Sequence, residues 1–137
     1  MRERTCVILA SSRAMFVALR ERLTGCAEAV HPGAGTVYEV GRLDESGGAF
    51  EVALVEVEPG AVTAAVETER ALSHWTPGLM LSVGTALGLE GCGHVGDVLV
   101  ATRVYGYEAG SDTPEGFRAR PELGMADHRL EQQARAE

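Results

Sequence analysis

The residues best suited to form a ligand site are the loop at positions 84–89, Gly-Thr-Ala-Leu-Gly-Leu, which follows an apolar run at positions 79–83. A buried strand that ends in a loop of small residues exposes backbone amides that a ligand can approach closely. A second short motif, Gly-Asp-Val-Leu-Val-Ala at positions 96–101, lies a few residues further on. The loop therefore predicts where a nucleoside or a phosphate would bind.

The polar and aromatic residues that follow the loop have competing explanations. Asp97 is typical of a turn at the entry to a strand. Arg103 is placed either to bind an anion at the mouth of a sheet or, more commonly, to pair with a neighbouring carboxylate. Tyr105, Tyr107 and Phe117 can stack on a base, or they can anchor their segment on the body of the protein or at a subunit interface.

The remaining chemically active residues do not form a metal or disulfide pattern. The four histidines (His31, His74, His94 and His128) have no i, i+4 pair and no nearby cysteine pair, so we expect no metal site. The three cysteines (Cys6, Cys26 and Cys92) lack paired spacing, which indicates reduced thiols. Glu67 and Glu69 are predicted on a solvated helix face. Arg118, Arg120 and Arg129 are expected to form ordinary surface ion pairs.

Composition excludes several classes of function. The 137 residues carry a net charge of −8, which argues against nucleic acid as a partner because phosphate binding requires a basic surface. All 12 basic residues are arginines, so neither a Schiff-base lysine nor a P-loop lysine is available. The apolar run at 6–10 is too short for a signal peptide, and no run is long enough to span a membrane. We expect a cytoplasmic protein with no membrane partner.

Hydrophobic patterning predicts a single α/β domain. Strands are expected at 5–10, 37–43, 50–57, 79–83 and 97–102, and the second and third of these form a hairpin over 36–57. One helix is expected to begin at Ser11 or Ser12 and to end at Gly25, with Met15, Leu19 and Leu23 on one side. A second helix is expected over 61–75. The predicted core covers 4–103. An irregular loop at 104–121 and a helix at 127–137 follow it.

Several of these segments together resemble the nucleoside phosphorylase/nucleosidase superfamily, in particular its 5′-methylthioadenosine/S-adenosylhomocysteine nucleosidase branch. The matching segments are VALVEVEPG at 52–60, the helix at 61–75 containing ETER, PGLMLSVG at 77–84, the 85–89 loop, GDVLVA at 96–101 and VYGYE at 104–108. Their order and spacing are more specific than any single glycine pattern. The resemblance covers nearly the whole chain but only the N-terminal half of the family's domain.

The resemblance implies a fold and a reaction. The fold is a three-layer α/β/α domain with a mixed sheet, truncated to its N-terminal half, which leaves a sheet edge and apolar surface uncovered. The reaction is cleavage of the N-glycosidic bond of a purine nucleoside by water or phosphate, without a cofactor or metal. The implied substrate-binding residues are Gly84, Thr85, Ala86 and Gly88, together with Arg103.

The resemblance also predicts that the chain lacks catalytic residues. The family has a glutamate after the first strand that handles the attacking water, and Met15 occupies that position here. Leu87 replaces a glycine in the loop and would project into the space that a ribose needs. The family's ribose-binding glutamate and base-protonating aspartate come from its C-terminal half. We therefore expect either an inactive nucleosidase-like chain or a non-catalytic nucleoside-binding module. The latter would be completed by a second copy or by a partner chain. A structural remnant that binds no ligand is the third alternative.

Overall fold

The computed structural model describes residues 4–45, 48–89, 93–106, 108–125 and 127–135. The chain divides into two compact units, residues 1–87 and residues 88–137. Their positions relative to one another are not determined, so each unit is described by itself. The expectation that they form one partial domain stays a prediction.

The first unit is built on a five-stranded mixed sheet with the order β2-β3-β4-β1-β5. Its strands are β1 (Arg4–Ala10), β2 (Thr24–Val30), β3 (Val37–Glu45), β4 (Gly48–Glu56) and β5 (Leu79–Val83). β1 is parallel to both β4 and β5, whereas β2, β3 and β4 are antiparallel neighbours. The β3–β4 pairing confirms the predicted hairpin.

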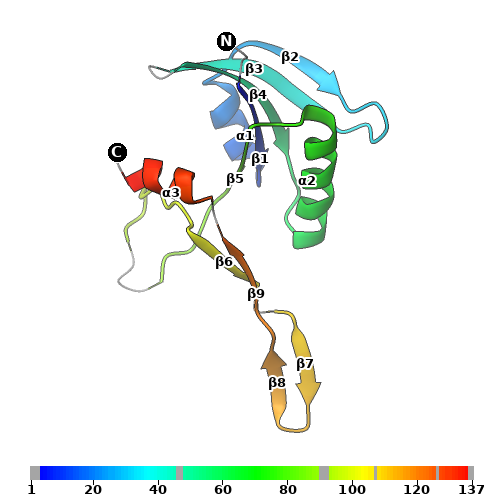
Figure 1. Ribbon diagram of the computed structural model, residues 1–137, viewed down its shortest axis with the longest axis vertical. Coiled ribbons are helices and arrows are strands. Elements are labelled where there is room, and N and C mark those ends of the chain that lie inside the picture. The colour runs from blue at the N-terminus through cyan, green and yellow to red at the C-terminus, as the bar shows by residue number, and fades with distance from the viewer. Residues whose placement is uncertain (1–3, 46–47, 90–92, 107, 126, 136–137) are drawn as a thin grey trace. The chain divides into compact units, whose positions relative to one another are not determined.

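Two helices cover the two faces of this sheet, giving three layers (Figure 1). α1 (Arg13–Arg20) packs on one face through Phe16, and α2 (Ala61–Trp75) packs on the other through Ala71. Strand β1 lies between them and alternates its side chains. Cys6, Ile8 and Ala10 are buried on the α1 side, and Val7 and Leu9 are buried on the α2 side. This alternation explains why β1 reads as a continuous apolar run.

The sequence prediction was wrong about the segment between α1 and β3. The helix ends at Arg20 rather than at Gly25, and residues 24–30 form β2, which was not predicted. Gly25 has a φ of 63° and lies where the β2–β3 register shifts, so its left-handed conformation serves a bulge and not a helix end. Strand β2 was hard to recognise from the sequence because it lies at a sheet edge and most of its residues are exposed.

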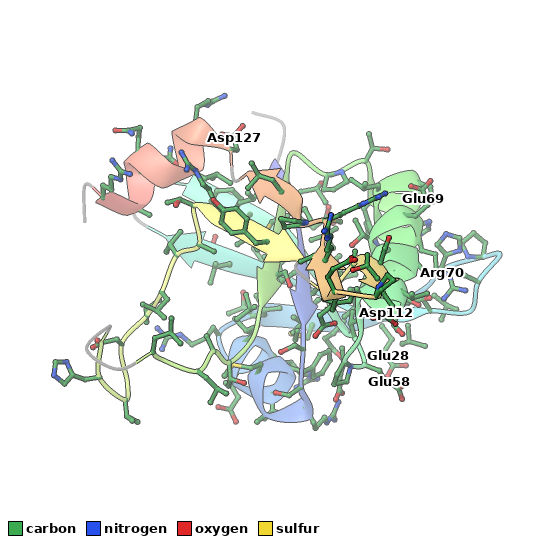
Figure 2. All side chains as sticks on the ribbon, turned by 90° about the horizontal axis from the view of Figure 1, so that it is seen from below. Glu28, Glu58, Glu69, Arg70, Asp112 and Asp127 are labelled. Atoms are coloured by element: carbon green, nitrogen blue, oxygen red, sulfur yellow. The ribbon has the colours of Figure 1, made fainter. Side chains whose placement is uncertain are left out.

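The second unit contains two separate antiparallel ladders and a short helix. β6 (Arg103–Gly106) pairs with β9 (Glu122–Met125), and β7 (Gly110–Thr113) pairs with β8 (Gly116–Ala119). α3 (His128–Arg135) begins after Asp127, whose carboxylate accepts hydrogen bonds from the amides of Arg129 and Leu130 (Figure 2). The C-terminal helix was therefore correctly predicted within the described residues.

Two sequence predictions for the second unit were wrong. Residues 97–102 are irregular instead of forming a strand, because no described segment of this unit pairs with them. Residues 104–121, predicted as an irregular loop, contain most of β6 and all of β7 and β8. The β7–β8 hairpin closes at Gly116, whose φ of 115° favours glycine. Among the described residues, no helix is long and apolar enough to cross a membrane.

Candidate functional site

The candidate site in the first unit is the sheet edge where three parallel strands end. Ala10 of β1 is in register with Glu56 of β4 and with Val83 of β5, so all three strands finish on the same rung. Hydrogen bonding continues one residue further. The Ser11 amide donates to the Val83 carbonyl at 2.9 Å, and the Val57 amide donates to the Ala10 carbonyl at 2.8 Å. The loops that leave this edge therefore start from fixed positions.

Gly84 allows the closest approach between two of these loops. A Cβ placed on Gly84 would collide with the hydroxyl oxygen of Ser11 and would lie 3.2 Å from its Cβ. Only glycine fits here without movement of Ser11 or of the loop. Thr85 and Ala86 follow on the same side of the sheet and are exposed, so backbone and hydroxyl groups are accessible at this edge. Leu87 is 97% exposed.

The first turn of α1 carries no carboxylate. The Ser12 hydroxyl accepts a hydrogen bond from the Met15 amide at 3.4 Å and caps the helix. The Met15 side chain is half-buried and packs against the apolar cluster between α1 and the sheet. A thioether in apolar contact cannot take a proton from water.

Three charged residues at this edge, Arg13, Glu56 and Glu58, were not identified from the sequence. Arg13, at the start of α1, pairs with Glu56 at the end of β4 with an N–O distance of 3.3 Å, and its guanidinium lies 4.9 Å from the Phe16 ring centre. Glu58 follows and is exposed (Figure 2). The signal in the sequence was Glu-Val-Glu directly after a buried strand. It places the Glu56 carboxylate on the same rung as Ala10, but Glu56 is already paired with Arg13.

A groove with a volume of about 580 Å³ runs along α1 on its β2–β4 side. Arg13–Glu56 lines it, as does a second ion pair between Arg20 and Glu39, with an N–O distance of 3.0 Å. The hydrogen bond to Glu39 and the charge of that carboxylate raise the pKa of Arg20. Because both arginines have carboxylate partners, these pairs fasten α1 to the sheet.

Gly88 and Arg103, the other two predicted substrate-binding residues, belong to the second unit. Gly88 is exposed with open space around its Cα, and Arg103 is exposed at the start of β6. Arg103 forms no ion pair with any side chain described in this unit. Their position relative to Gly84 is not determined because Gly84 belongs to the other unit, and their part in binding stays a prediction.

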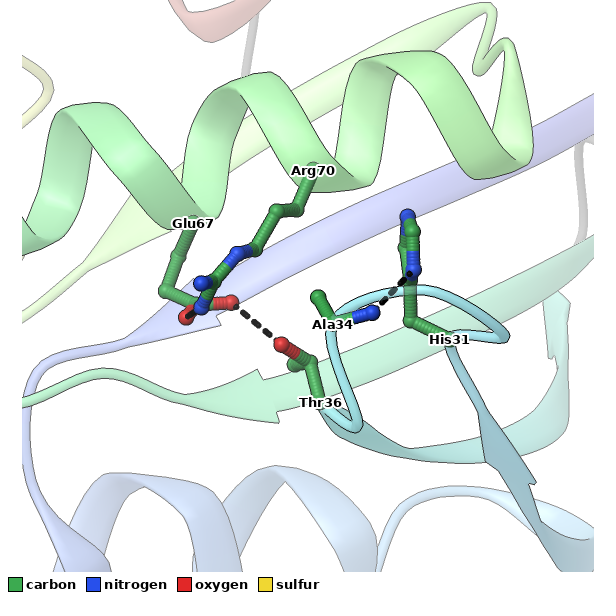
Figure 3. A network of polar contacts seen from close by, with 5 residues as sticks. All are labelled: His31, Ala34, Thr36, Glu67 and Arg70. Carbon is green, nitrogen blue, oxygen red and sulfur yellow. Dashed lines mark hydrogen bonds and ion pairs between the residues drawn. The ribbon is translucent and has the colours of Figure 1, made fainter.

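The prediction for Glu67 was wrong. Its side chain is only 14% exposed, pairs with Arg70, and accepts a hydrogen bond from the Thr36 hydroxyl at 3.0 Å (Figure 3). Glu67 thus connects α2 to the loop before β3. Glu69 does lie on the exposed side of α2 as expected (Figure 2). Helical spacing alone could not reveal that Glu67 faces a polar loop.

The histidines are less scattered than the sequence indicated. The rings of His31 and His74 lie with their centres 5.0 Å apart, and His74 also contacts Tyr38 and Trp75. No group of three possible metal ligands occurs among the described residues. His94 lies in a turn where the Asp97 carboxylate accepts its amide hydrogen bond at 2.7 Å, which supports the turn role of Asp97.

Outcomes for the other predicted surface residues are mixed. Tyr105 and Phe117 are about half exposed, and Tyr107 lies outside the described residues. Arg118 pairs with Glu115 at 3.8 Å as predicted. For Arg120 and Arg129, by contrast, no ion pair forms with the side chains that the structure describes.

The two described cysteines are free thiols. Burial raises the pKa of the Cys6 thiol from 9.0 to about 11, so this thiol stays protonated and unreactive at neutral pH. Cys26 is half-buried near the α1 side of β2, and Cys92 lies outside the described residues.

Several known proteins are similar to this chain in sequence or in fold. The 5′-methylthioadenosine/S-adenosylhomocysteine nucleosidase of Geobacillus kaustophilus is 35% identical over 86 residues, which are 63% of this chain and 34% of that protein. The adenine-bound nucleosidase structure from Colwellia psychrerythraea superposes with a TM-score of 0.79 at 22% identity, over 98% of this chain and 55% of that chain. The Streptococcus pyogenes enzyme with 5-methylthiotubericidin gives a TM-score of 0.80 at 20% identity, over 99% and 57%.

These likenesses confirm the predicted α/β fold and the prediction that the chain matches only part of the family's domain. The chain spans about half the length of the solved relatives and about a third of the curated one. Residues 4–137 also match the sequence pattern of the family described as the Phosphorylase superfamily. This match covers nearly all of the sequence, and the chain therefore belongs to the phosphorylase superfamily.

Proposed function

We propose that residues 1–137 form one wall of a binding site for purine nucleosides of the methylthioadenosine and S-adenosylhomocysteine type. The observation that carries this proposal is the common edge of β4, β1 and β5, where Gly84 packs against Ser11. This contact leaves the Thr85–Ala86 backbone accessible, as a ligand that approaches main-chain amides requires. The adenine and nucleoside analogues bound to the similar structures support this choice of ligand.

We further propose that Gly84, Thr85, Ala86, Gly88 and Arg103 are substrate-binding residues, as the resemblance to the nucleosidases implies. An arginine without a described carboxylate partner is suited to bind an anionic group.

We propose that these 137 residues alone do not catalyse the reaction. Cleavage of an N-glycosidic bond needs an oriented nucleophile, a proton for the leaving base and negative charge near the sugar. Met15 supplies none of these, and Glu56 is neutralised by Arg13. The missing groups would come from further polypeptide, either of the same protein or of a partner.

The second candidate function is a non-catalytic nucleoside-binding or regulatory module completed by another chain. The observation that favours it is the exposed apolar run of the second unit, in which Val98, Leu99 and Val100 are 90%, 63% and 57% exposed. Apolar surface of this kind marks a binding face for protein. Self-association into a homo-oligomer would cover it in the same way.

We place this role in the cytoplasm, within nucleoside metabolism and methionine salvage. The free thiols of Cys6 and Cys26 support a reducing compartment. The substrate class supports the metabolic assignment, because methylthioadenosine is a product of S-adenosylmethionine chemistry.

Two measurements on the 137-residue chain test the proposal. Calorimetry with methylthioadenosine is expected to show saturable binding that Gly84→Ala abolishes, because the added methyl group displaces Ser11. Gly78→Ala is the matched control, since a Cβ there meets only a carbonyl oxygen at 3.9 Å. An assay for adenine release is expected to show no turnover.

Each contrary result would disprove a different part of this proposal. Adenine release by the purified chain would disprove the absence of catalysis. A lack of nucleoside binding by the chain, both alone and mixed with a nucleosidase C-terminal half, would disprove the binding wall. Binding that appears only in the mixture would favour the module completed by another chain.

A further inference from the structure

The loop between β2 and β3, residues 31–36, is folded around the side chain of His31. The His31 amide donates to the Thr36 carbonyl at 2.8 Å, and the Gly35 amide donates to the His31 carbonyl at 3.0 Å. Inside this turn, Nδ1 of His31 accepts hydrogen bonds from the amides of Gly33 and Ala34, both at 3.1 Å. Figure 3 shows the bond from Ala34. A nitrogen that accepts two N–H groups carries no proton. The folded loop therefore requires a neutral His31 with its proton on Nε2.

The same loop is attached to α2 at two points. At one point the His31 ring lies beside the ring of His74, in the last turn of α2, with 5.0 Å between their centres. At the other the Thr36 hydroxyl donates to Glu67 at 3.0 Å, and Glu67 also pairs with Arg70. The loop thus fastens the β2–β3 end of the sheet to the helix that covers it.

The surroundings offer no stabilisation to a charged His31. The titratable and charged groups facing it are His74, Glu67 and Arg70 from α2 and Tyr38 from β3. Glu67 is already shared between Arg70 and Thr36. Burial holds Tyr38 in its neutral form by raising its pKa. None of the described carboxylates lies within ion-pair distance of His31.

We propose that this loop is an acid-sensitive clamp between the sheet and α2, with His31 as its sensor. Protonation at Nδ1 turns the acceptor into a donor that faces two other donors, so the bonds from Gly33 and Ala34 break. The resulting positive ring lies next to the ring of His74, with 5.0 Å between their centres. The clamp is closed while Nδ1 of His31 is unprotonated and opens when Nδ1 takes up a proton.

NMR of the 137-residue chain tests this directly. At pH 7.5 the imidazole ¹⁵N shifts of His31 should report the Nε2–H tautomer, and the Gly33 and Ala34 amides should be protected from exchange. Between pH 7.5 and pH 5 we expect their protection, corrected for intrinsic exchange at each pH, to fall about tenfold, as the loss of hydrogen bonds of ordinary strength implies. An Nδ1–H tautomer at pH 7.5 would overturn the proposal.

Three variants separate the sensor from its neighbours. His31→Asn keeps an acceptor that can bond the Gly33 amide but does not titrate, so its loop protection should not depend on pH. His74→Phe keeps an aromatic ring beside His31 and removes the second imidazole, and it should retain the pH dependence. His94→Asn, which removes a 94% exposed histidine of the other unit, should behave as the wild type. Equal pH dependence in the wild type and in His31→Asn would refute the clamp.

Discussion

The two units of this chain hold similar kinds of secondary structure but differ in what they bury. Every fully buried apolar side chain among the described residues belongs to the first unit, where β1 and β4 are covered on both faces by α1 and α2. The second unit has two-stranded ladders whose apolar side chains, among them Val104, Phe117 and Leu123, are more than half exposed. Backbone pairing alone therefore makes strands, whereas a stable core needs a second layer.

The largest expected effect tests this difference in burial. Leu54 of β4 is fully buried, so Leu54→Ala should lower the free energy of unfolding by about 2–5 kcal/mol. Leu123 of β9 is 55% exposed, and Leu123→Ala should change the same quantity by no more than about 0.5 kcal/mol. Urea denaturation followed by circular dichroism measures both. Similar losses in the two variants would mean that the second unit has a core of its own.

The next effect concerns pH and again arises from burial in the first unit. Cys6 has a pKa raised from 9.0 to about 11, so the unfolded thiol ionises before the folded one. The contribution of Cys6 to the free energy of unfolding is therefore fully present below pH 9. It is lost between pH 9 and 11, which lowers the free energy of unfolding by roughly 2–3 kcal/mol. Cys6→Ala should remove this alkaline loss, measured as the difference in urea midpoint between pH 8 and pH 11. If Cys26→Ala removed it instead, the assignment to Cys6 would be wrong.

A smaller effect is expected at the contact between Gly84 and Ser11. Gly84→Ala should destabilise the first unit by about 1–3 kcal/mol, because the added Cβ overlaps the Ser11 hydroxyl. Gly88→Ala, in the open part of the second unit, should be nearly neutral. Adding Ser11→Gly should rescue Gly84→Ala, since it removes both atoms that the new methyl group meets. A failure of this rescue would show that the backbone, and not Ser11, excludes a side chain.

The smallest effects compare two hydroxyl groups on the α2 side of the sheet. The Tyr38 hydroxyl is buried and has no hydrogen-bond partner among the described residues, so Tyr38→Phe should leave stability unchanged or raise it by up to about 1 kcal/mol. The Thr36 hydroxyl is bonded to Glu67, and Thr36→Val should lower stability by about 1 kcal/mol. Thermal unfolding of the two variants gives the signs. A loss for Tyr38→Phe would reveal a partner for that hydroxyl.

Sequence patterns predicted the bounds of an element most reliably where burial of that element required apolar residues at set positions. The bounds of α2 and β5 were predicted as observed, and β1 differs by a single residue, because continuous or periodic apolar runs there face the two helices. The exposed edge strand β2 has no such pattern. Residues 97–102 show the opposite failure, since an apolar run predicts a strand only if another strand pairs with it.

The site was predicted in part for a related reason. A small-residue loop after a buried strand located Gly84 at the end of β5, whereas the replacement of a glutamate by Met15 stays a prediction from the resemblance to nucleosidases. The Arg13–Glu56 pair and the Glu67 contact with Thr36 connect residues 43 and 31 positions apart. Such pairs depend on sheet register, which the sequence pattern did not resolve once β2 had been missed.

The hydrogen bonds that continue past the ends of β1 and β4 have a consequence for the thermodynamics of binding. Ser11 and Val57 are held by the neighbouring strands before any ligand arrives. Ordering a loop on binding lowers affinity through lost conformational entropy, and residues that are already fixed avoid that loss. A ligand that contacts this edge should therefore bind with little entropic penalty from the first unit, and rigid nucleoside analogues should gain the most.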